Sequence, residues 1–203
     1  MKRLLKQKSI LVILTVAIIS IATIGIFSIK NSNDSLLSNV STTSKVIPNN
    51  IELSNITHPI RIRIPSIKVD ASVEDVGITK NGLMDSPKGP DTVGWFHLGT
   101  MPGEIGSAVM DGHSGWVNNT PAVFDDLYKV KKGDEIQVEN SNGVILTFVV
   151  RETKKYSPDA DATDVFKSDD NGIHLNLITC TGFWNTILKS RSQRLVVFTD
   201  LKN

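Results

Sequence analysis

The longest uncharged stretch of the chain lies near its N-terminus, over residues 9–29, and is rich in Ile, Leu and Val. A helix needs about 20 residues to cross the hydrocarbon layer of a membrane, and this stretch is long enough. The apolar region of a cleaved signal peptide is shorter, at about 7 to 15 residues, and ends at a small-residue site that is not evident here. We therefore predict a transmembrane signal anchor over residues 9–29.

The charges around this stretch predict its orientation. Four basic side chains precede it: Lys2, Arg3, Lys6 and Lys8. Lys30 alone follows it directly. Because basic residues concentrate on the cytoplasmic side of membrane spans, residues 1–8 are expected in the cytoplasm and the rest of the chain outside the cell. The sequence thus predicts a single-pass protein of the cell membrane with an extracellular domain.

The next segment, residues 30–58, is rich in Ser, Asn and Thr and contains no Phe, Trp or Tyr. It shows no sustained apolar period, so it cannot bury enough surface to offset the entropy lost on ordering. We predict a flexible extracytoplasmic linker here. Residues 59–203 then have the length of one domain with its own core.

The pattern of residues 59–203 is mostly that of β-strands. Residues 60–64 alternate Ile and Arg, which puts three isoleucines on one face and two arginines on the other. Six further runs are β-like: 71–78, 107–110, 135–139, 144–152, 174–179 and 194–199. Helix is scarce, with short turns expected only near 123–128 and 164–167. Seven short strands with Asn-Gly turns indicate an all-β fold, either a sandwich or a barrel.

The charge of this domain argues against one class of partner. Residues 59–203 contain 16 Lys and Arg against 19 Asp and Glu, a net charge of about −3. Proteins that bind nucleic acid usually present a basic surface. We therefore expect no nucleic-acid partner.

The chain has a single cysteine, Cys180. Exported domains usually carry paired cysteines or none, so this one is a reactive thiol, an intermolecular bridge or an inert buried side chain. A nucleophilic cysteine needs a base or a cation nearby and a donor for the oxyanion. His113 follows an apolar run that ends in Gly112, and Arg194 opens the last β-like run. If the strands that contain Cys180 and Arg194 are neighbours, the guanidinium lies near the thiol. Arg191 is an alternative donor.

These residues resemble the signature of the sortases, the cysteine transpeptidases of Gram-positive cell surfaces. The counterparts are Leu177-Ile178-Thr179-Cys180, Gly112-His113 and Arg194, with Asn176 where many sortases have Thr. The resemblance covers nearly the whole of residues 59–203 and is strongest to class F, followed by classes D and E.

The resemblance implies an eight-stranded β-barrel with Cys180, His113 and Arg194 as catalytic residues. Cys180 is expected to attack a sorting signal similar to Leu-Pro-x-Thr-Gly between Thr and Gly and to form a thioester. An amine of a peptidoglycan precursor then resolves it, which anchors a surface protein to the cell wall. His113 is expected to transfer the protons, and Arg194 to bind the oxyanion or orient the peptide. At neutral pH most molecules are expected to hold the thiol and the neutral imidazole, so turnover is slow.

Five residues are expected to contact the peptide: Asn176, Ile178, Val165, Phe166 and Trp184. Alternation puts Asn176, Ile178 and Cys180 on one strand face, which predicts a groove wall. No cofactor is expected, and the acidic stretch 159–170 is a weak candidate for Ca²⁺ because it lacks a calcium-loop pattern. Two other functions stay open: a cell-wall cysteine hydrolase, and a tethered surface-binding module with a non-catalytic thiol.

Alternation also puts the Asp111 carboxylate on the same strand face as His113. We hypothesise that this carboxylate favours the imidazolium form of the histidine.

Overall fold

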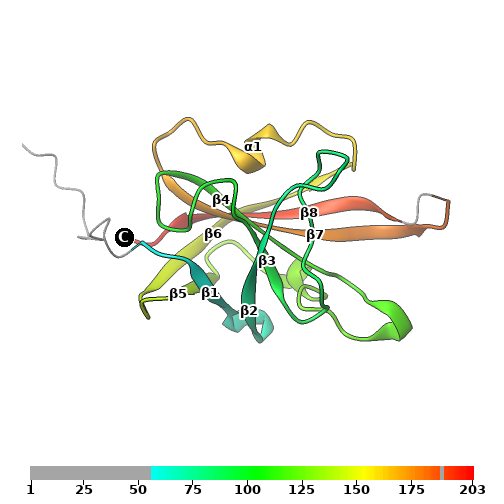
Figure 1. Cartoon of the computed structure of the whole chain (residues 1–203), viewed down its shortest axis with the longest axis horizontal. Helices are drawn as coiled ribbons and strands as arrows, with labels where there is room; N and C mark the ends of the chain where they lie inside the picture. The colour runs from blue at the N-terminus through cyan, green and yellow to red at the C-terminus, as the bar shows by residue number, and fades with distance from the viewer. Residues whose placement is uncertain (1–55, 188–189) are drawn as a thin grey trace, which may run out of the picture. The chain divides into compact units, whose positions relative to one another are not determined.

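The computed structural model describes residues 56–187 and 190–203. The predicted anchor at 9–29 and most of the predicted linker lie outside these residues. The described chain forms a closed barrel with the strand order β1-β2-β3-β4-β7-β8-β6-β5 (Figure 1). Its eight strands are Pro59–Ile64 (β1), Val69–Val76 (β2), Val93–Phe96 (β3), Gly106–Gly112 (β4), Glu135–Asn140 (β5), Ile145–Tyr156 (β6), Ile173–Asn185 (β7) and Ser190–Leu201 (β8). This architecture confirms the all-β, eight-stranded prediction.

Helices are short. They are η2 (Pro65–Ile67), η3 (Val117–Asn119), η4 (Leu127–Lys129) and α1 (Thr163–Phe166). The predicted turn near 164–167 corresponds to α1, which lies in the long connection between β6 and β7 (Figure 1). Among the described residues, none of the helices has the length and apolar character to span a membrane.

The strand that the residue pattern misses is β3. It has only four residues, and Gly94 interrupts them, so no period-2 alternation is visible in the sequence. Tertiary packing makes it a strand: Val93 and Trp95 are buried, and β3 pairs with both β2 and β4.

The alternation in β1 holds for two of its three isoleucines. Ile62 and Ile64 are fully buried, whereas Ile60 is 42% exposed. The pairing of β1 with β5 shifts register between Pro59 and Arg61, and this irregularity turns Ile60 away from the core.

The last residues of the predicted linker lie against the barrel. The His58 ring packs edge-on to Trp95 with 5.3 Å between ring centroids, and its Nε2 lies 3.0 Å from Asp75. The packed part of the chain therefore begins slightly before β1.

Two hydrophobic clusters organise the domain. The larger fills the barrel and includes Leu175 and Leu177 of β7. The smaller lies outside the barrel wall and joins Val165 of α1 to Val109, Val196 and Phe198. Because successive β7 side chains alternate between the two sides of the wall, Ile178 faces the outer cluster. The functional site lies on this apolar outer surface.

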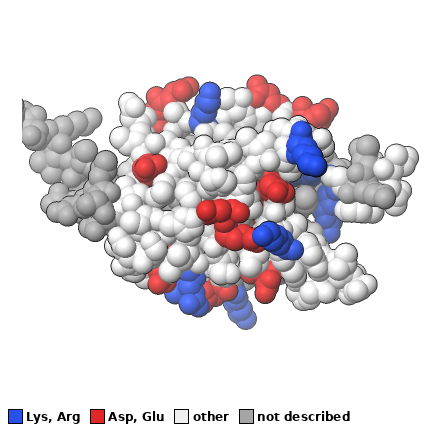
Figure 2. Space-filling view, in the orientation of Figure 1, with Lys and Arg blue, Asp and Glu red and all other residues white. Residues whose placement is uncertain are grey.

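The surface charge agrees with the similar numbers of acidic and basic residues in the sequence. Acidic and basic side chains are interspersed on the visible face, which shows no continuous basic area (Figure 2).

Candidate active site

The cysteine strand and the arginine strand are neighbours, as the sequence predicts. Strands β7 and β8 are antiparallel, and Cys180 and Arg194 are Cα partners across them. Tyr156 of β6 is in turn the partner of Arg194. The pairing therefore sets a tyrosine, an arginine and a half-buried free cysteine in one row across three strands. The sequence could not predict the place of Tyr156, because it contains no signal for which strand pairs with β8.

A groove of about 410 Å³ runs along this row. Cys180 and Arg194 both line it. Its apolar lining includes Val165 and Phe166 of α1, Ile178 of β7 and Val196 of β8. Its polar lining includes Ser86 and Asp111. The segment 83–86, which pattern reading did not single out, contributes further lining.

The predicted peptide contacts divide into two groups. Ile178, Val165 and Phe166 line the groove. Asn176 is 1% exposed and does not line it; its Nδ2 instead donates a hydrogen bond of 2.7 Å to the Val165 carbonyl. Trp184 is 58% exposed and lines a different cavity. Asn176 thus holds α1 against the sheet, and α1 in turn presents Val165 and Phe166.

His113 follows β4 directly. Its Nε2 lies 2.8 Å from the Pro87 carbonyl, and its ring lies 4.6 Å from the Trp116 ring. A carbonyl only accepts hydrogen bonds, so Nε2 carries a proton in this arrangement and Nδ1 is the nitrogen free to exchange one. A β-carbon added at Gly112 would overlap the Phe124 ring, which explains why a glycine precedes the histidine.

His113 does not line the groove. It lines a cavity of about 820 Å³ together with Trp116, Trp184 and Arg191. A smaller cavity of about 250 Å³ is lined by both Cys180 and Arg191. Cys180 thus lines this cavity as well as the groove.

The two candidate arginines differ in position. Arg194 lines the groove, and its Nη1 donates to the carbonyls of Arg191 (3.1 Å) and Gln193 (3.0 Å), while its Nη2 bonds Ser190 Oγ at 3.1 Å. Arg191 donates to the Gly182 carbonyl at 3.0 Å and lines the cavities outside the groove. Of the two arginines, Arg194 is thus the one that lines the groove.

Comparison with known proteins identifies the family of this chain. The model of the sortase domain matches residues 62–202, most of the chain. The chain belongs to the sortase family. Sortases are cysteine transpeptidases, so the protein is an enzyme of that type.

Solved structures agree with this assignment. Sortase C-1 from Actinomyces oris is 29% identical, with a TM-score of 0.57 over 71% of this chain and 75% of that one. A lid mutant of sortase A from Corynebacterium diphtheriae is 26% identical, with a TM-score of 0.55 over 71% and 70%. A sortase D5 transpeptidase from Clostridium perfringens is 27% identical, with a TM-score of 0.53 over 74% and 84%. The comparison with curated proteins gives no match.

The electrostatics of the sortase thiol favour its protonated form. Burial raises the pKa of Cys180 above its ordinary value, Arg194 and Arg191 lower it, and Asp111 raises it. Burial outweighs the two cations in this balance. In the free enzyme the thiol is therefore the dominant form at neutral pH.

The acidic connection between β6 and β7 shows no arrangement for a metal. Among residues 56–187 and 190–203, no group of three or more His, Cys, Asp or Glu side chains is placed to hold an ion. Asp161 accepts hydrogen bonds from Thr163, Asp164 from the Tyr156 hydroxyl, and Asp170 from His174. These carboxylates are thus used within the protein.

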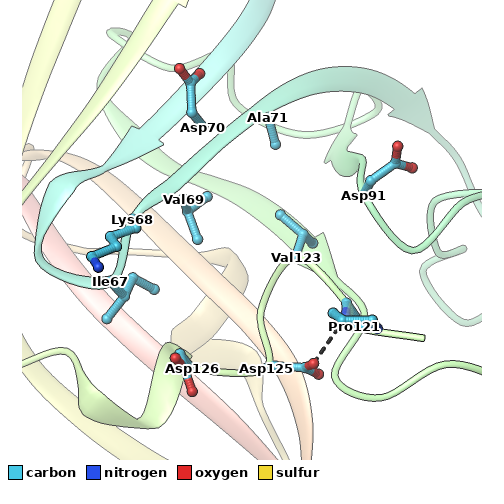
Figure 3. Close-up of a pocket in the computed structure, with 11 residues that line it drawn as sticks. Ile67, Lys68, Val69, Asp70, Ala71, Asp91, Pro121, Val123, Asp125 and Asp126 are labelled. Atoms are coloured by element: carbon cyan, nitrogen blue, oxygen red, sulfur yellow. Dashed lines mark hydrogen bonds between the residues drawn. The ribbon is translucent and has the colours of Figure 1, made fainter. Parts of the chain in front are cut away.

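A further cavity, of about 480 Å³, lies away from the sortase site (Figure 3). None of the catalytic candidates lines it. Three of its carboxylates have partners: Asp70 bonds Arg61, Asp126 pairs with Lys129, and Asp125 accepts from the Ala122 N–H, the bond dashed in Figure 3. We assign this cavity no part in the reaction.

Proposed function

We propose that this sortase cleaves a sorting signal similar to Leu-Pro-x-Thr-Gly between Thr and Gly and transfers the upstream protein to an amine of a peptidoglycan precursor. The observation that carries the proposal is the pairing of Cys180 with Arg194 along an apolar groove. A groove lined by Val165, Phe166, Ile178 and Val196 suits the Leu and Pro side chains of such a signal.

In the first half of the reaction the Cys180 thiolate attacks the carbonyl carbon of the Thr residue. A carbon–sulfur bond forms, and the carbonyl electrons move to oxygen. Arg194 stabilises this oxyanion, since a fixed guanidinium lowers the energy of charge that develops in the transition state. His113 gives the proton on Nδ1 to the Gly nitrogen, the carbon–nitrogen bond breaks, and a thioester remains on Cys180.

In the second half an amine attacks the thioester carbon. His113 takes the proton of the amine, the carbon–sulfur bond breaks, and Cys180 leaves as thiolate while the new amide forms. Water in place of the amine would release a free acid. The presence of an acceptor amine therefore decides between transfer and hydrolysis.

We propose further that the enzyme is a class F sortase held in the cell membrane by residues 9–29, with its catalytic domain outside the cell. The apolar length of that stretch and the excess of basic residues before it support this topology. Protease added to intact cells should digest residues 59–203 while residues 1–8 stay protected. Full protection of the domain would reject the topology.

The reaction is tested with the purified full-length chain in detergent, a library of Leu-Pro-x-Thr-Gly peptides and a glycine amine. Chromatography with mass detection should show the transfer product with the amine and the free acid without it. Cys180→Ala is the control and should give neither. Peptides that stay intact throughout the library would reject the proposed signal, and free acid alone in saturating amine would make the enzyme a hydrolase.

A further inference from the structure

A carboxyl group is part of the groove next to the catalytic thiol. Asp111 is the residue before Gly112 in β4, and its Cα partners are Gly94 of β3 and Ile178 of β7. It lines the groove together with Cys180 and Arg194. Asp111 precedes His113 by two residues, and its partner Ile178 precedes Cys180 by two residues. Asp111 interacts electrostatically with both His113 and Cys180, the predicted proton-transfer pair.

The titratable and charged groups around this carboxyl come from several elements. His113 follows it on its own segment, Cys180 lies on β7, Arg194 on β8 and Tyr156 at the end of β6, and Asp85 lines the same groove. Ser86 and the Gly112 backbone lower the pKa of the carboxyl.

No cation neutralises this carboxyl directly. Among residues 56–187 and 190–203, no ion pair includes Asp111. The guanidinium of Arg194 bonds the carbonyls of Arg191 and Gln193 and the Ser190 hydroxyl. Asp111 therefore acts on its neighbours through its own charge.

The direction in which Asp111 shifts the pKa of its neighbours follows from the sign of its charge. Burial raises the pKa of Asp111, although Ser86, His113 and Arg194 lower it in part. When it is ionised, Asp111 raises the pKa of Cys180, because a carboxylate repels the thiolate. The same negative charge attracts the His113 imidazolium. The ionised carboxylate thus favours the protonated thiol of Cys180.

We propose that Asp111 is a positioning residue that sets the pH range in which the Cys180 thiol ionises, and that it moves this range to higher pH. The inference deepens the proposed function and rests on it for the role of Cys180 as the nucleophile. Asp111 need not touch the peptide to act in this way. It tunes the enzyme to a neutral or alkaline surface rather than an acidic one.

The test is the pH profile of the full-length enzyme and its Asp111→Asn variant, measured in two ways. Alkylation of Cys180 by iodoacetamide needs no peptide and reports the thiolate directly. Its profile should move to lower pH in Asp111→Asn, with a rate at pH 7 raised about threefold or more, since half a pH unit changes a minor thiolate fraction about threefold. The limb of the kcat/KM profile for transpeptidation that follows ionisation of Cys180 should move in the same direction.

Three further variants separate charge from structure. Asp126→Asn removes the same charge from an exposed surface pair with Lys129 and should leave both profiles in place. Asp111→Glu keeps the charge and should stay close to the wild-type profile. Ser86→Ala removes a hydroxyl that lowers the pKa of Asp111, so it should move the profiles in the direction of Asp111→Asn by a smaller amount. It serves as the test if Asp111→Asn does not fold.

Profiles of Asp111→Asn that are unmoved, or moved to higher pH, would overturn the inference. A shifted alkylation profile in a protein that cleaves no sorting peptide would reject the proposed function and leave the electrostatic role of Asp111 standing.

Discussion

The Thr179 hydroxyl donates a buried hydrogen bond of 2.6 Å to the Gly112 carbonyl. Thr179 immediately precedes Cys180, and Gly112 immediately precedes His113. The bond therefore fastens the end of the histidine strand to the cysteine strand, next to both candidate catalytic side chains. Alignment of the two depends on this contact and on the parallel pairing of β4 with β7.

Thr179→Val is expected to remove this bond while it keeps the shape of the side chain. The free energy of unfolding should fall by about 1 to 3 kcal/mol, because the Gly112 carbonyl loses a buried donor. Misalignment of the catalytic pair should lower kcat/KM about tenfold or more. Denaturant unfolding and steady-state kinetics measure the two effects.

The chain offers a matched control for this variant. Thr199 donates an equally short bond, 2.6 Å, to the Leu175 carbonyl, at a site remote from the thiol. Thr199→Val should cost similar stability and leave kcat/KM nearly unchanged. Equal kinetic losses in both variants would show that the Thr179 bond has no special part in alignment.

Arg194→Ala is expected to lower kcat/KM by about 10² to 10³, the usual cost of losing one oxyanion donor. Arg191→Ala should cost much less, because Arg191 lines the cavities outside the groove. Both variants should slow alkylation of Cys180 at a fixed pH, since each arginine lowers the pKa of the thiol. A larger kinetic loss in Arg191→Ala would transfer the role to that residue.

Asn176→Leu is expected to act through α1. Loss of the Nδ2 bond to the Val165 carbonyl should lower the free energy of unfolding by about 1 to 3 kcal/mol. Because Val165 and Phe166 line the groove, KM for the peptide should rise more than kcat falls. An unchanged KM would mean that α1 keeps its place without the asparagine.

Acid stability should depend on Asp170. Its carboxylate accepts a hydrogen bond from His174 at 2.9 Å, and His174 also bonds Asp200 at 2.8 Å. The bond from His174 lowers the pKa of Asp170 below its ordinary value. A carboxyl with a lowered pKa stabilises the fold above its unfolded pKa, and the contribution is lost as pH falls through the folded value.

Asp170→Asn should therefore have a lower Tm than the wild type at pH 7, and the difference should close as the pH falls below about 4. Thermal unfolding between pH 7 and pH 3 measures this, with Asp169→Asn in the same connection as the control. A difference that stays constant over this range would assign the effect to packing and not to ionisation.

The sequence predicts the parts of this enzyme that depend on local pattern. Alternation places Leu175 and Leu177 inside the barrel and Ile178 with Cys180 on the groove side, and both placements hold because β7 is a regular paired strand. The adjacency of the cysteine and arginine strands was also predictable, since few residues separate them.

The placements that the local pattern did not give depend on distant contacts. Asn176 has the correct strand face for the groove, but α1 covers it, and a strand pattern does not reveal what packs on top. Trp184 lies beyond a register shift between Thr181 and Trp184, so alternation counted from Cys180 no longer applies to it. The row from Tyr156 through Arg194 to Cys180 required the strand order, which local pattern does not determine.

The measurement that tests the central claim most directly is the intact mass of the full-length chain after brief exposure to a Leu-Pro-x-Thr-Gly peptide, with no amine present. The account predicts an added mass equal to the peptide portion up to Thr, located on Cys180, removed by hydroxylamine or a glycine amine and absent in Cys180→Ala. Cleavage of the peptide with no adduct at any time, or an adduct that persists in Cys180→Ala, would contradict a thioester mechanism at this residue.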